Sequence, residues 1–289
     1  MVPPHAPSAA EMDGPQAARF ADGRLHLHHG PIDLILEAAG PGREDGYARA
    51  TERFQSILEE LAADLPALRT DINVGALIES QIGAAMTRAC RSFIPAFVTP
   101  MAAVAGTVAD EILDAMIRAQ GIRKAYVNNG GDVALYLTEG ETFDAAIVSE
   151  QSGAFRISSA DPVRGIATSG WRGRSHSLGI ADAVTILAPN AAMADVAATL
   201  IANAVDLPGH PAVQREPAVD LFPDSDLGER HVTVAVGQLT KIETEVALSS
   251  GGAFAEDCRQ RGLIKAAALS LNGAIKIVGD TALLTGANP

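Results

Sequence analysis

The sequence predicts an α/β (α+β) fold in which mixed or antiparallel sheets are packed by helices. Short apolar strand candidates alternate with segments of helical periodicity along the 289 residues. Hydrophobic residues make up 47% of the chain, enough to bury a sizeable core at this length. Aromatic residues contribute only 4%, so we expect a core made mainly of aliphatic and alanine side chains.

The chain is expected to form one domain preceded by a tail. Residues 1–18 are rich in proline and alanine without periodicity, which predicts a disordered tail. Residues 19–289 are predicted to form a single domain of two interlocked lobes, because strands and helices alternate throughout. No fixed-period repeat is visible, which argues against solenoids and propellers.

Helical spacing of apolar residues predicts a helix over 46–68 and another over 106–118. An alanine-rich segment, 190–205, predicts a third helix with Asn190 as its N-cap. Further helix-like segments lie near 243–247 and 254–261. Two strands around a Gly-Pro turn are expected within 24–38.

Further strands are predicted from β-branched and aromatic residues at 124–127, 133–137, 144–148, 154–158, 183–187, 231–236 and 273–278. A polar, proline-rich stretch, 208–226, predicts a long loop.

Charge and composition exclude several classes of protein. The chain has 35 acidic against 22 basic residues, a formal net charge of -13, which argues against nucleic-acid partners. No stretch reaches the roughly 18 unbroken apolar residues of a membrane helix, so no membrane partner is expected. Prolines replace the apolar core of a signal peptide, and Cys90 and Cys258 are too few for a disulfide framework. We therefore expect a cytoplasmic protein.

Four segments are glycine-rich or polar within apolar surroundings: 99–110, 127–133, 167–182 and 194–199. The small residues of the first allow close approach of a ligand or of another chain segment. The second combines a hairpin turn signal with three polar side chains, so it indicates either a structural turn or an Asn/Asp-lined ligand contact.

The third segment holds the only tryptophan, with Arg172 and Arg174 beside it. It could bind an anionic group while Trp171 stacks on a planar one, or it could be a surface loop. Because the G-x-S-x-G elbow is absent, a serine nucleophile is unsupported.

In the fourth segment, Asp195 and Thr199 share one helix face, an arrangement that suits a hard cation such as Mg²⁺. The alternative is an Asp that hydrogen-bonds to nearby backbone. Two weaker candidates are His26 with His28, either a metal pair or a solvated strand edge, and Cys90, either activated by neighbouring arginines or simply buried.

Taken in order, these segments resemble the ApbE-like superfamily, whose best-known members are FAD:protein FMN transferases. The resemblance rests on a small-residue loop ending in Asp110, on Gly130-Gly131-Asp132, on Thr168-Ser169-Gly170 and on the Asp195-x-x-x-Thr199 helix. The whole chain is most similar to a shorter branch of unassigned function.

The resemblance implies roles for particular residues. Asp195 and Thr199 would hold Mg²⁺, with a loop carbonyl near Ala102 as the third ligand. His176 is the implied acid/base, with Asp182 as its orienting partner or as a second carboxylate. The implied flavin- or nucleotide-binding residues are Met101, Ala103, Gly106, Asn128, Asn129, Gly130, Gly131, Asp132, Thr168, Ser169, Gly170 and Arg172.

Three functions follow from this resemblance. The first is an enzyme, a transferase that binds a flavin- or nucleotide-like small molecule with a divalent cation in a crevice formed by the four segments. The second is a non-catalytic cofactor-binding or delivery module, which is favoured over FMN transfer itself because Ala105 stands where the transferases carry a lysine. The third is a structural homo-oligomer, for which a dimer is the expected state.

Overall fold

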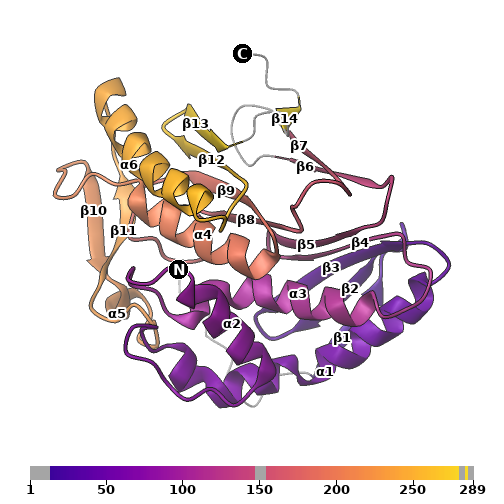
Figure 1. Cartoon of the computed structure of the whole chain (residues 1–289). Coiled ribbons are helices and arrows are strands. Elements are labelled where there is room, and N and C mark those ends of the chain that lie inside the picture. Colours follow the sequence, from indigo (N-terminus) through magenta and orange to yellow (C-terminus); the bar gives the residue numbers. More distant parts are fainter. Residues whose placement is uncertain (1–13, 147–153, 280–283, 286–289) are drawn as a thin grey trace.

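The computed structural model describes residues 14–146, 154–279 and 284–285. Within them, a nine-stranded sheet runs in the order β1-β2-β3-β4-β5-β8-β9-β12-β13, with antiparallel neighbours throughout (Figure 1). Its strands are β1 (Gln16–Arg19), β2 (Leu25–His29), β3 (Ile32–Ala39), β4 (Lys124–Asn129), β5 (Asp132–Leu137), β8 (Gly165–Ser169), β9 (Ala183–Ala188), β12 (Ala266–Leu271) and β13 (Ala274–Gly279).

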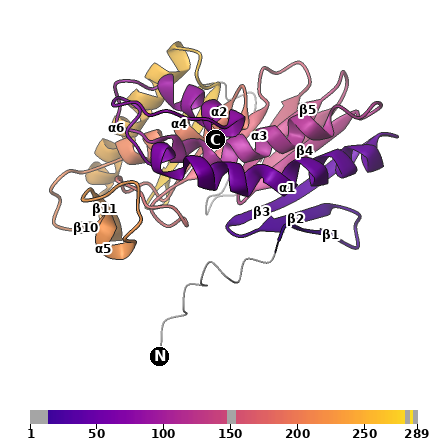
Figure 2. The ribbon, with the colours of Figure 1, turned by 90° about the horizontal axis from the view of Figure 1, so that it is seen from below.

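One face of this sheet carries the long helices (Figures 1 and 2). They are α1 (Arg43–Leu68), α2 (Gln81–Arg91), α3 (Val104–Met116), α4 (Ala191–Ala204) and α6 (Lys241–Gln260). Four of them pack mainly on one strand pair each: α1 contacts β2–β3, α3 contacts β4–β5, α4 contacts β8–β9 and also β5, and α6 contacts β12–β13. The two parts of the sheet have a similar chain order, in which two strands, a helix, an inserted segment, a second helix and two strands follow one another: α2 is inserted between α1 and α3, and β10-α5-β11 between α4 and α6.

The opposite face of the sheet is covered by a small sheet of β6 (Thr142–Ala146), β7 (Ala154–Ser158) and β14 (Leu284–Thr285). A second apolar cluster, which includes Phe155 and Ile157 of β7 and Leu187 of β9, fills the space between the two sheets. A separate hairpin, β10 (Val213–Pro217) and β11 (His231–Val236), lies with the short helix α5 (Ala218–Leu221) at one end of the molecule (Figure 2).

The predicted fold class of helices packed on antiparallel sheets is confirmed, and so are most predicted elements. Asn190 caps α4, as its side chain accepts a hydrogen bond from the Met193 amide at 2.8 Å. The turn at Gly130 joins β4 and β5 in an antiparallel hairpin, as expected. The predicted strand over 144–148 is β6 up to Ala146, and its last two residues lie outside the described residues.

Four predictions need correction. Residues 16–18 were expected in the tail, but regular structure begins at Gln16, where β1 pairs with β2. The rest of the predicted tail, up to residue 13, lies outside the described residues. The expected loop over 208–226 contains β10 and α5, and the strands β8 and β12 were not predicted. The two helix-like segments near the C-terminus form one helix, α6, which continues through Gly251, where a Cβ atom would lie 2.2 Å from Val205 Cγ2.

Both cysteines are buried inside the protein. Cys90 and Cys258 are buried free thiols, and burial raises the pKa of both, that of Cys258 to about 11. Among the residues that the structure describes, no helix is both long and apolar enough to cross a bilayer.

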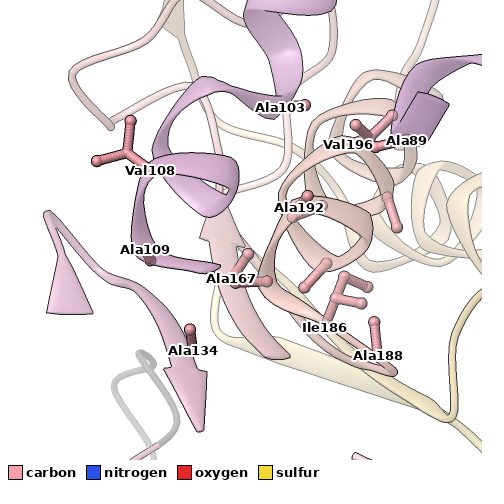
Figure 3. Packing of buried hydrophobic residues seen from close by; sticks show 14 of the residues in the cluster. Ala89, Ala103, Val108, Ala109, Ala134, Ala167, Ile186, Ala188, Ala192 and Val196 are labelled. Carbon is pink, nitrogen blue, oxygen red and sulfur yellow. The ribbon is translucent and has the colours of Figure 1, made fainter. Parts of the chain in front are cut away.

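The helices α3 and α4 approach closely because Gly106 has no side chain. A Cβ atom at Gly106 would lie 2.2 Å from the carbonyl oxygen of Ala191, the first residue of α4. Buried alanines such as Ala109, Ala167 and Ala192 fill the space between these helices and the strands (Figure 3). The close approach predicted for the small-residue segment is therefore an approach to another part of the chain.

Each of these two helices caps the other. The Asp110 carboxylate of α3 accepts hydrogen bonds from the Ala191 and Ala192 amides at 3.0 and 2.9 Å. In return, the Asp195 carboxylate of α4 accepts one from the Gly106 amide at 3.0 Å. The first amides of any α-helix lack partners within the helix, so this exchange satisfies both buried helix starts.

Replacing Gly106 with alanine is expected to destabilise the protein by about 1–3 kcal/mol or more, because backbone must move to admit the new methyl group. Urea unfolding followed by circular dichroism measures this change. Gly14→Ala is the control, since a Cβ there meets nothing within 4 Å. An unchanged unfolding midpoint in Gly106→Ala would contradict the proposed packing.

Candidate ligand and cation site

The four segments meet around one pocket of about 720 Å³. They approach one another because α3, α4 and the ends of β5 and β8 are neighbours in the fold. The first segment contributes Met101, Val104 and Ala105; the second Asn129, Gly130 and Asp132; the third Thr168, Ser169, Gly170 and Arg174; and the fourth Asp195 and Thr199. The opposite wall comes from α1, with Leu58, Leu61 and Leu65, and we call this space the leucine chamber.

A second space of about 420 Å³ adjoins it. Asp132, Arg174, Asp195 and Thr199 line both spaces, so the two form one crevice with these side chains at the junction. We call the second space the phenylalanine chamber, because Phe97 and Phe222 line it together with Ala102 and His176.

Two carboxylates lie at this junction. Asp195 faces the crevice, and its Oδ2 is held by the Gly106 amide. Asp132 accepts a hydrogen bond from the Thr168 amide at 3.4 Å. Burial, and secondarily the negative charge of Asp132, raises the pKa of Asp195 well above its ordinary value, and burial raises that of Asp132 to about 7.

These residues fit a hard cation. Burial raises the pKa of both neighbouring carboxyl groups, although the charge of Arg174 lowers that of Asp132, and a bound divalent cation would favour their charged forms. The Thr199 hydroxyl and the Ala102 segment border the same junction and offer oxygen atoms of the kind that Mg²⁺ and Ca²⁺ take. The hydrogen bond from Gly106 to Asp195 also realises the alternative of an Asp bound to backbone, so this residue has a structural role as well.

The asparagines of the second segment hold the loops in place. Asn129 Nδ2 donates to the Ala105 carbonyl at 3.1 Å, which ties the β4–β5 turn to the start of α3. Asn128 Oδ1 accepts a hydrogen bond from the Gly131 amide at 2.8 Å, so it stabilises the turn itself. Gly130 has a φ of 64° and lies against the Arg174 guanidinium.

Two arginines line the crevice, and only Arg174 was expected from the sequence as a candidate for binding an anionic group. Arg69, at the end of α1, and Arg174 line both chambers. Arg172 is directed elsewhere: its side chain is 65% exposed, and its Nε donates to Asp182 at 2.9 Å. Arg174 could be nominated from its loop, but no local signal distinguishes Arg69 or the α1 leucines from ordinary helix residues.

His176 and Asp182, the two implied catalytic residues, are placed apart. His176 lines the phenylalanine chamber, with its ring centroid 5.1 Å from that of Phe222. Its Nε2 is buried and has no hydrogen-bond partner among the described residues. Asp182 does not line either chamber and accepts hydrogen bonds from Trp171, Arg172 and the Asn272 amide.

The remaining predicted residues do not line the crevice. Ala103 is fully buried in the core, and Gly106 acts through its amide on Asp195. Gly131 is exposed in the turn. His26 and His28 share a strand face beside Asp33, 3.1 Å from the His26 Nε2, and no group of three or more metal-ligating His, Cys, Asp or Glu side chains was found in the described ranges.

Comparison of this sequence with known proteins identifies a matching family and several relatives. A family model described as AbpE bacteria matches residues 17–277. The chain is 38% identical over 128 residues to a UPF0280 protein of Archaeoglobus fulgidus, covering 44% of this chain and 53% of that protein. It is 37% identical over 158 residues to a UPF0280 protein of Methanothermobacter thermautotrophicus, covering 53% and 59%. The chain thus spans about half the length of the curated relatives it matches.

Among solved structures, the apo form of Pseudomonas stutzeri flavinyl transferase ApbE aligns over 95% of this chain and 97% of its own. The TM-score is 0.41 and the sequence identity is 13%.

The raised pKa of Asp132 predicts how stability depends on pH. A carboxyl group that ionises at about 7 when folded and near 4 when unfolded keeps its proton longer in the folded state. Its contribution to stability is therefore full below pH 4 and is lost as the pH rises toward 7. In urea unfolding with EDTA present to remove metal ions, we expect Asp132→Asn to raise the free energy of unfolding more at pH 8 than at pH 4.5.

Asp144→Asn is the control for this prediction. Asp144 is exposed, and its hydrogen bonds to Arg156 lower its pKa, so its replacement should cost stability at pH 8. Equal effects of Asp132→Asn at both pH values would show that the carboxyl group ionises normally in the folded protein.

Proposed function

The chain belongs to the AbpE bacteria family, as its resemblance to the ApbE-like superfamily predicted, and on that premise we propose that it binds a flavin- or nucleotide-like ligand together with a divalent cation. The ligand would occupy the crevice, with its phosphate groups and the cation at the junction of the two chambers.

The observation that carries this proposal is the opposed charge at the junction. Asp132 and Asp195 line the same space as Arg69 and Arg174. The carboxylates and the Thr199 hydroxyl would hold a hard cation, while the two guanidiniums would pair with phosphate oxygens. A phosphate group that contacts the cation and the guanidinium groups needs carboxylates and arginines in one place.

The leucine chamber supports a planar apolar group as the other part of the ligand. Its volume of about 720 Å³ lies within the range of small-molecule pockets, and Leu58, Leu61 and Leu65 give it an apolar wall. A flat heterocycle could bury its faces there while its phosphates reach the junction. Flavins and nucleotides both have this division into an aromatic and an anionic part.

Binding without FMN transfer is the form of this proposal that the residues favour. Ala105 lines both chambers at the position where the resembling transferases carry a lysine, so that cation is absent from this position. His176, in the phenylalanine chamber, remains a candidate proton carrier for a transfer reaction. A homo-oligomer is compatible with either form, and size-exclusion chromatography with light scattering tests it separately.

Arg174→Gln is expected to weaken binding of FMN in the presence of Mg²⁺ by about 10- to 100-fold, because it removes a charged hydrogen bond to phosphate. Arg172→Gln is the matched control, since that arginine is two residues away, exposed and paired with Asp182. Calorimetric titration of both variants measures the difference. Equal losses in the two variants, or no FMN binding to the unaltered protein, would overturn the proposed site.

Incubation with FAD, Mg²⁺ and a carrier peptide separates binding from transfer. We expect FAD to bind, more weakly in Asp195→Asn because the cation loses a ligand, and we expect no flavinylated peptide. Mass spectrometry of the peptide detects the product. A mass increase of one FMN would establish the transferase instead.

A further inference from the structure

A third pocket, of about 270 Å³, lies where α2, α3 and the start of α4 meet. It shares no lining residue with either chamber of the crevice. Four of its lining residues, Thr107, Asp110, Glu111 and Asp114, come from α3 at spacings of three, four and seven. Such spacings place all four side chains on one helix face.

Thr107 is the unusual member of this set. Its side chain is buried, with 1% of the residue exposed, and its Oγ1 has no hydrogen-bond partner among the described residues. A buried hydroxyl without a partner costs stability, because it has lost its hydrogen bonds to water. A partner supplied from outside the chain would remove this cost.

The charges of the lining indicate what that partner is. Asp110, Glu111 and Asp114 contribute three carboxylates, against one guanidinium, that of Arg88. Arg53 pairs with Glu111 at 3.3 Å, whereas no ion pair of Asp110 or Asp114 within 4 Å occurs among the described residues, with Arg118 as the nearby positive charge of Asp114. Both amides at the start of α4 are already bound by Asp110, so they are not directed at a ligand anion.

We propose that this pocket binds a hard divalent cation, Ca²⁺ or Mg²⁺, through oxygen atoms of Asp110, Asp114 and the Thr107 hydroxyl. Such ions take carboxylate, hydroxyl and water oxygens, and a pocket of this volume leaves room for bound waters. The arrangement parallels the crevice, where Asp195 caps α3 and is followed four residues later by Thr199. Here Asp110 caps α4 and is followed four residues later by Asp114.

The bound cation would stabilise the helix packing and not the ligand directly. It would neutralise the Asp110 carboxylate, which caps α4, and would contact the buried Thr107 hydroxyl of α3. The proposal does not depend on flavin or nucleotide binding, because no residue is shared with the crevice.

The test is titration of the metal-free full-length protein with CaCl₂ by calorimetry, in an Asp195→Asn background that disables the crevice. One Ca²⁺ is expected to bind and to raise the melting temperature. Thr107→Val, which keeps the shape but removes the hydroxyl, should weaken Ca²⁺ binding about tenfold. Without Ca²⁺, that variant should be at least as stable as its parent, because an unsatisfied hydroxyl is gone.

Asp114→Asn is the second variant, since Asp114 is exposed enough for the change to leave the fold intact. It should weaken Ca²⁺ binding at least as much as Thr107→Val, whereas Glu245→Gln, on the exposed side of α6, should not. No Ca²⁺ binding to the Asp195→Asn protein, or equal affinity in all variants, would overturn the proposal. Loss of FMN binding alone would count only against the proposed function of the crevice.

Discussion

The exchange of carboxylates between α3 and α4 is the interaction on which the rest of the structure depends. Ala191 and Ala192 in the first turn of α4 and Gly106 in the first turn of α3 are buried, and buried amides without acceptors are costly. Asp110 and Asp195 each supply the missing acceptor to the other helix. The exchange needs the two backbones in contact, and only glycine at position 106 permits that distance. The contact between α3 and α4 at Gly106 therefore both stabilises the fold and positions the Asp195 carboxylate in the crevice.

The crevice lies at the seam between the two halves of the large sheet. The halves join through β5 and β8, which pair only at Val133 with Ile166 and at Ala134 with Gly165. Asp132 precedes this short pairing on β5, and Thr168 follows it on β8, so polar residues gather where the ladder ends. The helices that cover the seam are α3 and α4, which bring Ala105, Asp195 and Thr199 to the same place.

Charge is distributed unevenly around these helices. At the junction of the two chambers, Asp132 and Asp195 lie with Arg69 and Arg174, whereas the pocket beside α2 is lined by three carboxylates and one guanidinium. Burial raises the pKa of Asp110 to about 7 even though two amides lower it, as it does for Asp132 in the crevice. A protein that keeps such carboxylates in its interior requires protons or cations to neutralise them.

The sequence by itself determined the features that depend on neighbouring residues. Helical periodicity, the Asn190 cap, the turn at Gly130 and the shared face of Asp195 and Thr199 follow from local geometry. Tertiary contacts decided the rest. Arg174 lines the crevice, whereas Arg172 is exposed and paired with Asp182. Gly106 and Gly251 each lie too close to another segment to carry a side chain. Periodicity carries no information on these points, because the direction of a loop side chain and the need for a glycine depend on distant segments of the chain.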